Sequence, residues 1–377
     1  FAAGSYDEAC ELVEKADAEL LDAYCLAQRG SWPEFRATWC HPVPGVEGWS
    51  WDRTAEFIKQ NGVDHLILNA LHGASAGYPS KVLPTDATLP AGSDAFAQCV
   101  AACRKHGIKL HVWMTNYQSH GHAPKEFLER LKADGRLQVD VDGNPAEQLC
   151  PSDDRNLALQ RDAMVEAARI DGVAGIHFDY IRYPDGKKCY CPTCRSKFEA
   201  RIGHRVENWP HDVLGEGPVR EEWLQFRRDN ITRLVREVHA EVRRVAPDCI
   251  ISAAVFSGYP GCRDDVGQDW KLWVDEGLLD FVCPMDYTGS DAEFSSRVRT
   301  QLELVGGRIP CYPGIGLLEH KSPADAVRQI RITREQKTGG FVLWSVYQQY
   351  LETYSSLGKG VMAREESHPV PAGPDSA

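Results

Sequence analysis

The sequence predicts a closed (β/α)8 TIM barrel, in which eight parallel strands alternate with helices around one core. From residue 35 to residue 348, short runs rich in apolar and β-branched residues alternate eight times with longer runs of helical periodicity. Many of the helical runs end in Gly directly before the next strand, as the carboxyl ends of helices commonly do. No G-x-G-x-x-G follows the first strand, so the signature of an open dinucleotide-binding sheet is missing.

A helix is expected before the barrel. Over residues 6–28, apolar residues recur at spacings of three and four, and Asp7 and Glu8 lie near the amino end, where the helix dipole favours acidic groups. We therefore assign residues 1–34 to this helix and a lead-in, and 35–350 to the barrel. The segment 351–377 is assigned to a largely disordered extension, because the stretch from Glu365 onward is rich in Pro, Ser and charge.

The expected strands are 35–42, 65–71, 108–117, 175–184, 249–256, 280–287, 309–317 and 339–348. The helical runs that separate or follow them are 50–62, 94–107, 156–172, 221–247, 269–277, 291–307 and 323–340. The connections after the second, third and fourth strands are long. In a barrel of this kind the active site is built from the strand-to-helix loops, so these insertions are where a ligand is expected.

Charge and hydropathy exclude some partners. The net charge is −12 without a block of Lys or Arg, which argues against nucleic acid or an anionic membrane surface as a partner. No apolar run approaches the roughly 20 residues that cross a bilayer. A neutral or cationic ligand fits the composition better.

The fourth strand carries the main catalytic candidate. Its sequence, Gly-Ile-His-Phe-Asp-Tyr-Ile-Arg-Tyr-Pro, places His177 and Asp179 on one face near the carboxyl end, because alternate residues of a strand share a face. A carboxylate in that place is costly unless it is used or paired. Asp179 is therefore a reactive group, or it caps a turn or pairs with Arg182.

Polar and aromatic residues gather at several other strand ends. Aromatic rings stack on the apolar faces of sugars, and amides and carboxylates bind their hydroxyls, so such a set suits a carbohydrate. For each aromatic residue taken singly, core packing is the simpler explanation. The candidate substrate-binding residues are Asn69, His111, Trp113, His177, Arg182, Tyr287 and Trp344.

Hydrolysis of an acetal needs two carboxyl groups. Asp179 is the first candidate and Asp286 the second, with Glu147, Asp265 and Glu319 as alternatives in loops. Strict alternation puts Met285 and Tyr287 opposite Asp286, so Asp286 reaches the same site only through a bulge or the end of the strand. Otherwise Asp286 is a buried hydrogen-bond acceptor.

Cys189, Cys191 and Cys194 form the strongest local motif. Three cysteines within six residues suit a structural zinc site completed by Cys150 or Cys262, or a disulfide with one free thiol. Four other cysteines lie inside expected strands and are expected to be small core residues: Cys40, Cys249, Cys283 and Cys311.

The arginines of the run 221–247 alternate with Glu237 and Glu241, which is typical of a solvated helix face. Neither H-E-x-x-H nor G-x-S-x-G occurs. Two further functions stay open. One is a barrel that binds carbohydrate without catalysis. The other is a metal-dependent hydrolase or deacetylase that uses His41, His111, His177 and Asp179.

Four segments together resemble the family-10-like glycoside hydrolases, the bacterial barrel proteins related to a peptidoglycan glycan-strand hydrolase. They are GIHFDYIRYP (175–184), LCPSDDRN (149–156), LDFVCPMDYT (279–288) and GGFVLWSVYQ (339–348). The resemblance implies hydrolysis of a carbohydrate and export to the periplasm or the cell exterior. No cofactor is expected to be required for catalysis. The chain is more remotely similar to barrel chitinases through Met285, Tyr287 and Trp344. It lacks their D-x-x-D-x-D-x-E run, so their substrate-assisted mechanism is not expected.

Overall fold

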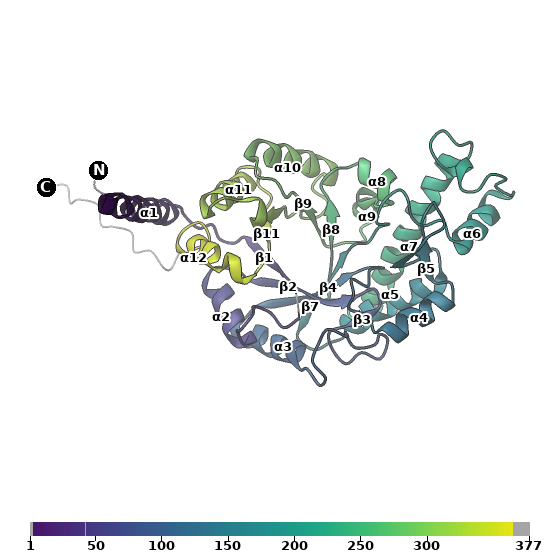
Figure 1. The fold of residues 1–377 in the computed structure, drawn as a ribbon, viewed down its shortest axis with the longest axis horizontal. Coiled ribbons are helices and arrows are strands. Elements are labelled where there is room, and N and C mark those ends of the chain that lie inside the picture. Colours follow the sequence, from purple (N-terminus) through teal and green to yellow (C-terminus); the bar gives the residue numbers. More distant parts are fainter. Residues whose placement is uncertain (1–2, 42, 365–377) are drawn as a thin grey trace.

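The computed structural model describes residues 3–41 and 43–364, and their strands close into a parallel barrel (Figure 1). β1 pairs in parallel with both β2 and β11, which joins the two edges of the sheet. The predicted barrel is confirmed. Its strands are β1 (Phe35–Cys40), β2 (His65–His72), β4 (Lys109–Thr115), β7 (Val173–Asp179), β8 (Ile250–Phe256), β9 (Phe281–Met285), β10 (Gly314–Gly316) and β11 (Gly340–Trp344).

Helices surround the barrel (Figure 1). Buried apolar side chains of these helices and of the strands form one core cluster. Side-chain caps fix the starts of several helices; Ser50, for example, accepts a hydrogen bond from the Arg53 amide at the start of α2. The helices after the strands are α2 (Trp51–Gln60), α3 (Ala95–His106), α4 (Lys125–Ala133), α5 (Asp154–Ala167), α6 (Pro192–Ile202), α7 (Arg220–Val245), α8 (Gly261–Val266), α9 (Trp270–Asp275), α10 (Asp291–Val305), α11 (Pro323–Glu335) and α12 (Leu351–Lys359).

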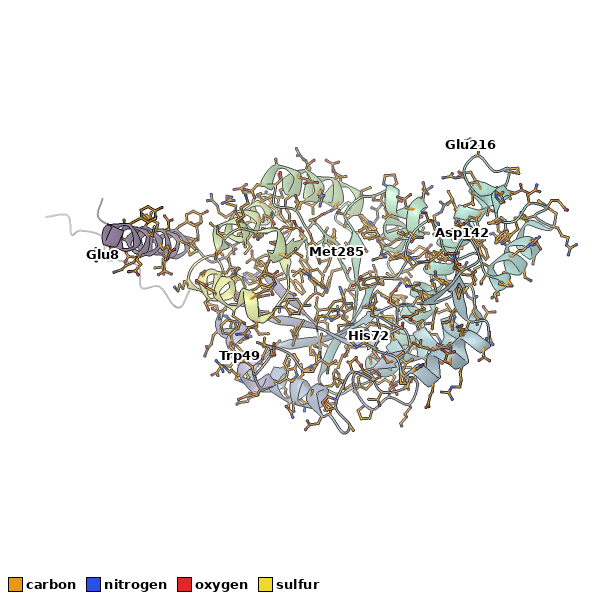
Figure 2. All side chains as sticks on the ribbon, in the orientation of Figure 1. Glu8, Trp49, His72, Asp142, Glu216 and Met285 are labelled. Atoms are coloured by element: carbon orange, nitrogen blue, oxygen red, sulfur yellow. The ribbon has the colours of Figure 1, made fainter. Side chains whose placement is uncertain are left out.

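The expected amino-terminal helix is present as α1 (Ala3–Leu26). In Figure 1 it extends away from the barrel beside α12, and Figure 2 marks Glu8 on it. Within residues 3–41 and 43–364, no helix combines the length and apolarity needed to cross a membrane.

Several boundaries differ from the expected ones. The fourth barrel strand, β7, ends at Asp179 and not at Pro184, because Tyr180 has a φ of 50° and breaks the extended backbone. Leu351–Lys359 form α12, which buries Tyr354 and bonds its hydroxyl to Thr38 Oγ1 at 2.5 Å, so the first part of the expected disordered extension is ordered. The segment 365–377 lies outside the described residues.

The loop after the third barrel strand contains elements that the sequence pattern did not predict. These are α4 and an antiparallel hairpin of β5 (Leu137–Val139) and β6 (Pro145–Leu149). A further short strand, β3 (Ser75–Ala76), pairs with the end of β2. All of them extend the wall on the side of the barrel where the strands end.

The inside of the barrel is layered. Near the strand starts, the Phe35 ring stacks on Tyr312 at 4.1 Å, and His111 lies against Gly175, where a Cβ atom would meet its Nδ1 at 2.4 Å. Higher up, Gly314 and Gly316 leave space for the rings of Trp39 and Tyr287, since a Cβ on either glycine would meet a ring carbon within 3.0 Å. Large aromatic side chains therefore fill the upper half of the barrel.

Candidate active site

We call the carboxyl ends of the barrel strands the mouth. Asp179 is the last residue of β7, and its side chain shares the inward face with His177. Its Oδ1 accepts a hydrogen bond of 2.6 Å from the Tyr180 amide, and its carbonyl accepts one of 2.8 Å from the Asn116 amide. The turn at Tyr180 thus fixes the carboxyl at the end of the strand.

Asp179 is only 5% exposed, and this burial raises its pKa from 3.8 to about 6. The Arg182 charge, the Tyr180 N–H and the Trp113 indole pull the pKa in the opposite direction and are outweighed. Arg182 lies between two rings, with Cζ 4.4 Å from the centroids of Tyr180 and Phe256. The carboxyl therefore keeps a proton at a pH where an exposed aspartate has lost it.

An aromatic cluster fills the mouth beside Asp179. The Trp344 ring lies 5.6 Å from Trp113, 5.8 Å from Trp39 and 5.9 Å from Tyr287, centroid to centroid. Trp344 and Tyr287 are partly exposed, whereas Trp113 is buried. The proximity of Asp179 helps to raise the pKa of Tyr287, after burial. The structure therefore brings Trp113, Tyr287 and Trp344 together with the carboxyl.

His177 supports this cluster from below. Trp39 Nε1 donates to His177 Nε2 at 3.1 Å, so the ring proton is on Nδ1, which donates to Ser252 Oγ at 2.8 Å. Burial lowers the pKa of His177 to about 3, in keeping with a neutral ring. Both nitrogens are used within the protein, so His177 positions Trp39 and has no polar atom left for a substrate.

His111 also does not reach the mouth. Its Nε2 lies 3.0 Å from His65 Nδ1 in the layer near the strand starts, because it stands two residues before Trp113 on β4. The expectation that His111 binds substrate does not fit this position. The metal-dependent alternative falls with it, because His111 and the hydrogen-bonded His177 cannot share an ion with Asp179.

Asp286 faces away from the mouth. Phe281, Cys283 and Tyr287 belong to the inner cluster of the barrel, so alternation turns Asp286 outward toward α10. There Gln301 Nε2 donates to its Oδ1 at 2.6 Å, and burial raises its pKa to about 7. Asp286 has no exposed surface. The expected second catalytic carboxyl is thus a buried acceptor between strand and helix.

Asn69 lies inside the barrel next to an irregularity of β2. Its Nδ2 donates to the carbonyls of Leu71 and Trp113, while Oδ1 has no hydrogen-bond partner among the described residues. The register of β2 against β4 shifts between Asn69 and Leu71. This bulge turns His72 inward as well, which regular alternation would not do.

A group that the sequence did not predict lies next to this bulge. His72, Asp86 and His122 place one ligand atom each within 4.8 Å of one another. They come from the end of β2 and two separate loops, so no spacing motif connects them. Burial lowers the pKa of His72 to about 3 and that of the nearby His41 to about 4.

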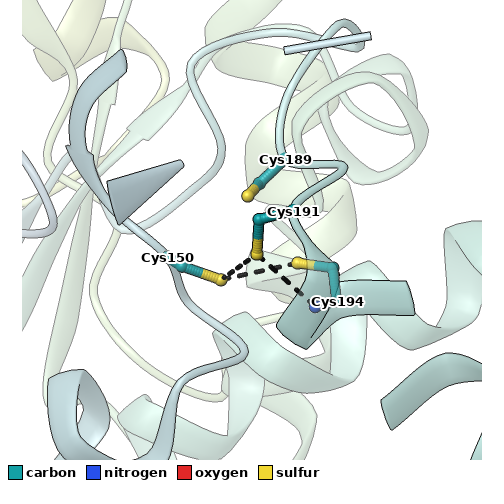
Figure 3. A group of neighbouring side chains, drawn as sticks. All are labelled: Cys150, Cys189, Cys191 and Cys194. Atoms are coloured by element: carbon teal, nitrogen blue, oxygen red, sulfur yellow. Dashed lines mark hydrogen bonds between the residues drawn. The ribbon is translucent and has the colours of Figure 1, made fainter. Parts of the chain in front are cut away.

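The predicted cysteine cluster has four members, and the fourth is Cys150 (Figure 3). The Cys150 Sγ lies 3.4 Å from Cys194 Sγ and 3.5 Å from Cys191 Sγ, and all four sulfur atoms lie within 4.8 Å of one another. Cys262 is elsewhere, with its Sγ bonded to the Gln268 carbonyl at 3.4 Å. The cluster could hold a structural zinc ion.

Two arginines of α7 are buried, contrary to the expected solvated face. Arg227 is 2% exposed and donates to the carbonyls of Asp185, Lys188 and Asp265 at 2.7–3.1 Å. Arg228 is 5% exposed and bonds Asp264 Oδ1 at 2.7 Å. Both side chains tie the loop after β8 to α7, and Arg227 also holds the loop that follows Asp179.

The three alternative carboxyls lie on the surface. Glu147 is exposed on β6, Asp265 on α8 after β8, and Glu319 on the short 3-10 helix η2 (Leu317–Glu319) directly after β10. Asp265 and Glu319 are thus on strand-to-helix loops. Among the described strand ends, Asp179 is the carboxyl that is turned inward.

Comparison with solved structures finds the same fold with little sequence identity. The glycoside hydrolase domain of PgaB (BpsB) from Bordetella bronchiseptica matches with a TM-score of 0.62 and 12% identity, over 82% of this chain and 93% of that one. The β-galactosidase from the psychrophilic Marinomonas ef1 matches with a TM-score of 0.62 and 9% identity, over 86% of this chain and 58% of that one. The catalytic domain of β-amylase from Paenibacillus polymyxa matches with a TM-score of 0.57 and 12% identity, over 86% of this chain and 94% of that one.

No curated protein sequence matches the chain. The family model of glycosyl hydrolase-like 10 matches residues 34–304, which include β1 to β9 and Asp179. This match covers most of the barrel and agrees with the shared fold. The chain belongs to the glycosyl hydrolase-like 10 family.

Proposed function

We propose that this protein hydrolyses O-glycosidic bonds in a polysaccharide or another glycan, with Asp179 as the proton donor. The observation that carries the proposal is a buried carboxyl with a pKa of about 6 at the mouth of the barrel. A general acid works best when its pKa lies near the working pH, because it then holds a proton and can still release it. Protonation of the leaving oxygen is the first requirement of acetal hydrolysis.

The side chains around Asp179 suit a sugar. Trp344 and Tyr287 present partly exposed rings on which a sugar face can stack. Asn69 Oδ1 is buried without a hydrogen-bond partner among the described residues, so a hydroxyl group of a ligand would satisfy it. Arg182, held against Tyr180, stands beside the carboxyl.

A second carboxyl must act as nucleophile or activate water. Since Asp286 faces α10, we assign this role to a loop residue and select Glu319, which is exposed directly after β10. Its carbonyl lies 3.0 Å from the position of a Cβ on Gly289, so η2 packs against the loop after β9.

The second candidate function is a barrel that binds glycans without cleaving them. This function is favoured because Asp179 is the single inward carboxyl among the described strand ends, whereas hydrolysis needs two carboxyl groups. This alternative predicts binding to a glycan without release of new reducing ends.

The deciding experiment incubates the protein with a panel of polysaccharides and measures new reducing ends. We expect the wild type to cleave at least one glycan, and Asp179→Asn and Glu319→Gln to lose this activity. The matched control is Asp286→Asn, which removes a carboxyl that faces α10 and should stay active. Glycan binding without cleavage by the wild type would favour the binding barrel, and an active Asp179→Asn variant would contradict the proposal.

We further propose, from the family resemblance, that the protein is exported to the periplasm or the cell exterior. Fractionation of the native host, with antibody detection of the protein, tests this; recovery with the cytosolic fraction would contradict it.

We also propose that Cys150, Cys189, Cys191 and Cys194 bind a structural zinc ion. Four thiolates at about 2.3 Å from a tetrahedral zinc ion stand about 3.8 Å apart. The distances of 3.4 and 3.5 Å from Cys150 Sγ to the sulfur atoms of Cys194 and Cys191 are close to this value. Backbone N–H groups of Val139 and Cys194 donate to Cys189 and Cys191 sulfur atoms, as suits thiolates. The ion would join the β5–β6 hairpin to the start of α6.

Metal analysis tests the zinc proposal. The wild type should hold one equivalent of zinc that Cys150→Ser lacks, and the Cys150→Ser variant should melt at a lower temperature. Thiol titration of denatured, unreduced protein should find all 13 cysteines free. At least two fewer thiols, without a loss of zinc in the variant, would show a disulfide instead.

A further inference from the structure

A second group of ligand-type side chains lies at the mouth, and it includes neither Asp179 nor the cysteines. We propose that His72, Asp86 and His122 bind a divalent transition-metal ion, with Zn²⁺ as the probe. Two imidazoles and one carboxylate are a recurrent ligand set for such ions and leave coordination positions open. This inference does not depend on the proposed glycoside hydrolysis.

The orientation of His72 is the first reason. Its Nδ1 lies 3.0 Å from Thr115 Oγ1, and a hydrogen bond on one imidazole nitrogen is how proteins fix the other nitrogen as a metal ligand. Nε2 lies 3.8 Å from Asp86 Oδ2, which is beyond hydrogen-bond distance. Two atoms bound at about 2.1 Å to one ion are separated by about 3–4 Å, so this spacing fits an ion between them.

The state of Asp86 is the second reason. Its side chain is 2% exposed, and its Oδ1 accepts hydrogen bonds from the Thr88 amide at 2.8 Å and the Thr88 hydroxyl at 2.7 Å. Oδ2 lies 2.8 Å from His122 Nδ1. Thr88 thus orients the carboxylate with Oδ2 toward both imidazoles, and a cation there would offset the cost of burying its charge.

The backbone around the group is fixed by hydrogen bonds between separate segments. The Asp86 amide donates to the Ala76 carbonyl at 2.8 Å, and the Ala87 amide donates to the His122 carbonyl at 2.8 Å. The β2 bulge turns His72 inward on the third side. The three residues are therefore held together by main-chain contacts and not by side-chain packing alone.

One adjustment is needed for an ion to bind. The rings of His72 and His122 are stacked, with centroids 3.8 Å apart and an interplanar angle of 10°, so their nitrogen lone pairs lie in two nearly parallel planes and do not converge on one point between the rings. The His122 side chain is 18% exposed, against 2% for His72, so His122 has room to rotate toward the ion.

The site adjoins the proposed catalytic carboxyl. Thr115, which bonds His72, is the register partner of Asp179 on the neighbouring strand. His120 lies between the two groups, with its ring 4.8 Å from Tyr180 and 6.5 Å from His72. An ion held here has its open positions near the mouth, where water or an oxygen atom of a ligand would complete its coordination.

Zinc titration of the chelator-stripped full chain tests the inference. The wild type should bind one equivalent more than Asp86→Asn or His122→Ala, or bind that equivalent at least about 100-fold more tightly. Thr115→Val, which removes the hydrogen bond that fixes His72, should weaken this equivalent by about 10–100-fold. The matched control is His106→Ala, because His106 also lies 2.8 Å from an aspartate, Asp52, but on the surface and without a second imidazole.

Equal zinc content and affinity in the wild type, Asp86→Asn and His122→Ala would overturn the inference and leave a hydrogen-bonded His–Asp pair. Loss of the same equivalent in His106→Ala would overturn it too. Circular dichroism checks the fold, and if His122→Ala does not fold, the nearly isosteric Asp86→Asn decides.

Discussion

The Asp179 carboxyl is buried, and no positive charge near it fully offsets the cost of burying its own negative charge. The Arg182 guanidinium that acts on it is held between two aromatic rings, and the remaining polar contacts do not balance the loss of water. Because the carboxylate is buried without full compensation, we expect it to lower the free energy of unfolding at neutral pH. Residues with such perturbed pKa values cluster at functional sites.

This cost can be measured. The folded pKa of about 6 exceeds the unfolded value of 3.8, so the folded state binds more protons between these values, and its stability falls as the pH rises from about 4 to about 6. At pH 7 the penalty is on the order of 3 kcal/mol. Asp179→Asn should therefore be more stable than the wild type at pH 7, with the difference shrinking toward pH 4, as measured by urea unfolding.

The exposed Asp142, on the turn of the β5–β6 hairpin, offers the control, and Asp142→Asn should leave stability unchanged at both pH values. An Asp179→Asn variant that is less stable than the wild type at pH 7 would show that the carboxylate is stabilised by its surroundings and is not a proton donor.

Asp286 has the same chemistry in a different place. Burial raises its pKa to about 7, and its Oδ2 has no hydrogen-bond partner among the described residues. Asp286→Asn keeps an acceptor for Gln301 and removes the buried charge. We expect this variant to have an unchanged or higher melting temperature and full activity by the reducing-end assay; loss of activity in a folded variant would restore Asp286 to the catalytic site.

At the scale of the elements, alternation predicted which side of a strand each residue faces but not its height in the barrel. It placed His177 and Asp179 on one face of their strand, and Asp286 on the face opposite to Met285 and Tyr287, as observed. It could not show that His111 lies near the strand starts, because height depends on how neighbouring strands are staggered.

The remaining differences at this scale arise from tertiary contacts. The β2 bulge has no sequence signature, so the inward turn of His72 was not predictable. The hairpin strands β5 and β6 span only three and five residues, too few for a clear alternation in the sequence. Arg227 and Arg228 follow helical charge spacing, yet the loops after β7 and β8 cover them.

Arg227 gives a prediction for the loop after Asp179. Its guanidinium donates to the Asp185, Lys188 and Asp265 carbonyls, and Arg227→Met would leave these acceptors without a donor. We expect a loss of at least about 2 kcal/mol in the free energy of unfolding, measured with urea.

Arg236 lies on the same helix, and its pair with Glu276 is exposed, so Arg236→Met should cost no more than about 1 kcal/mol. Equal losses for the two variants would show that Arg227 does not anchor the loop.

For the whole molecule, the sequence was sufficient to predict the barrel and to place Asp179 and several aromatic residues at the carboxyl ends of its strands. Eight alternating units defined the closure, and the inward aromatic residues and Asp179 defined the mouth. Clusters built from separate loops were harder to predict from the sequence. Local spacing identified Cys189, Cys191 and Cys194. The proximity of His72, Asp86 and His122 arises only in the folded chain.

The pH dependence of glycan cleavage tests the central claim most directly. On a polysaccharide that the panel identifies, the rate at which the wild type releases reducing ends should fall as the pH rises above about 6, because Asp179 then loses the proton that it donates. Folded Asp179→Asn should release none at any pH. Turnover by this variant, or a wild-type rate that does not fall above pH 6, would contradict the account.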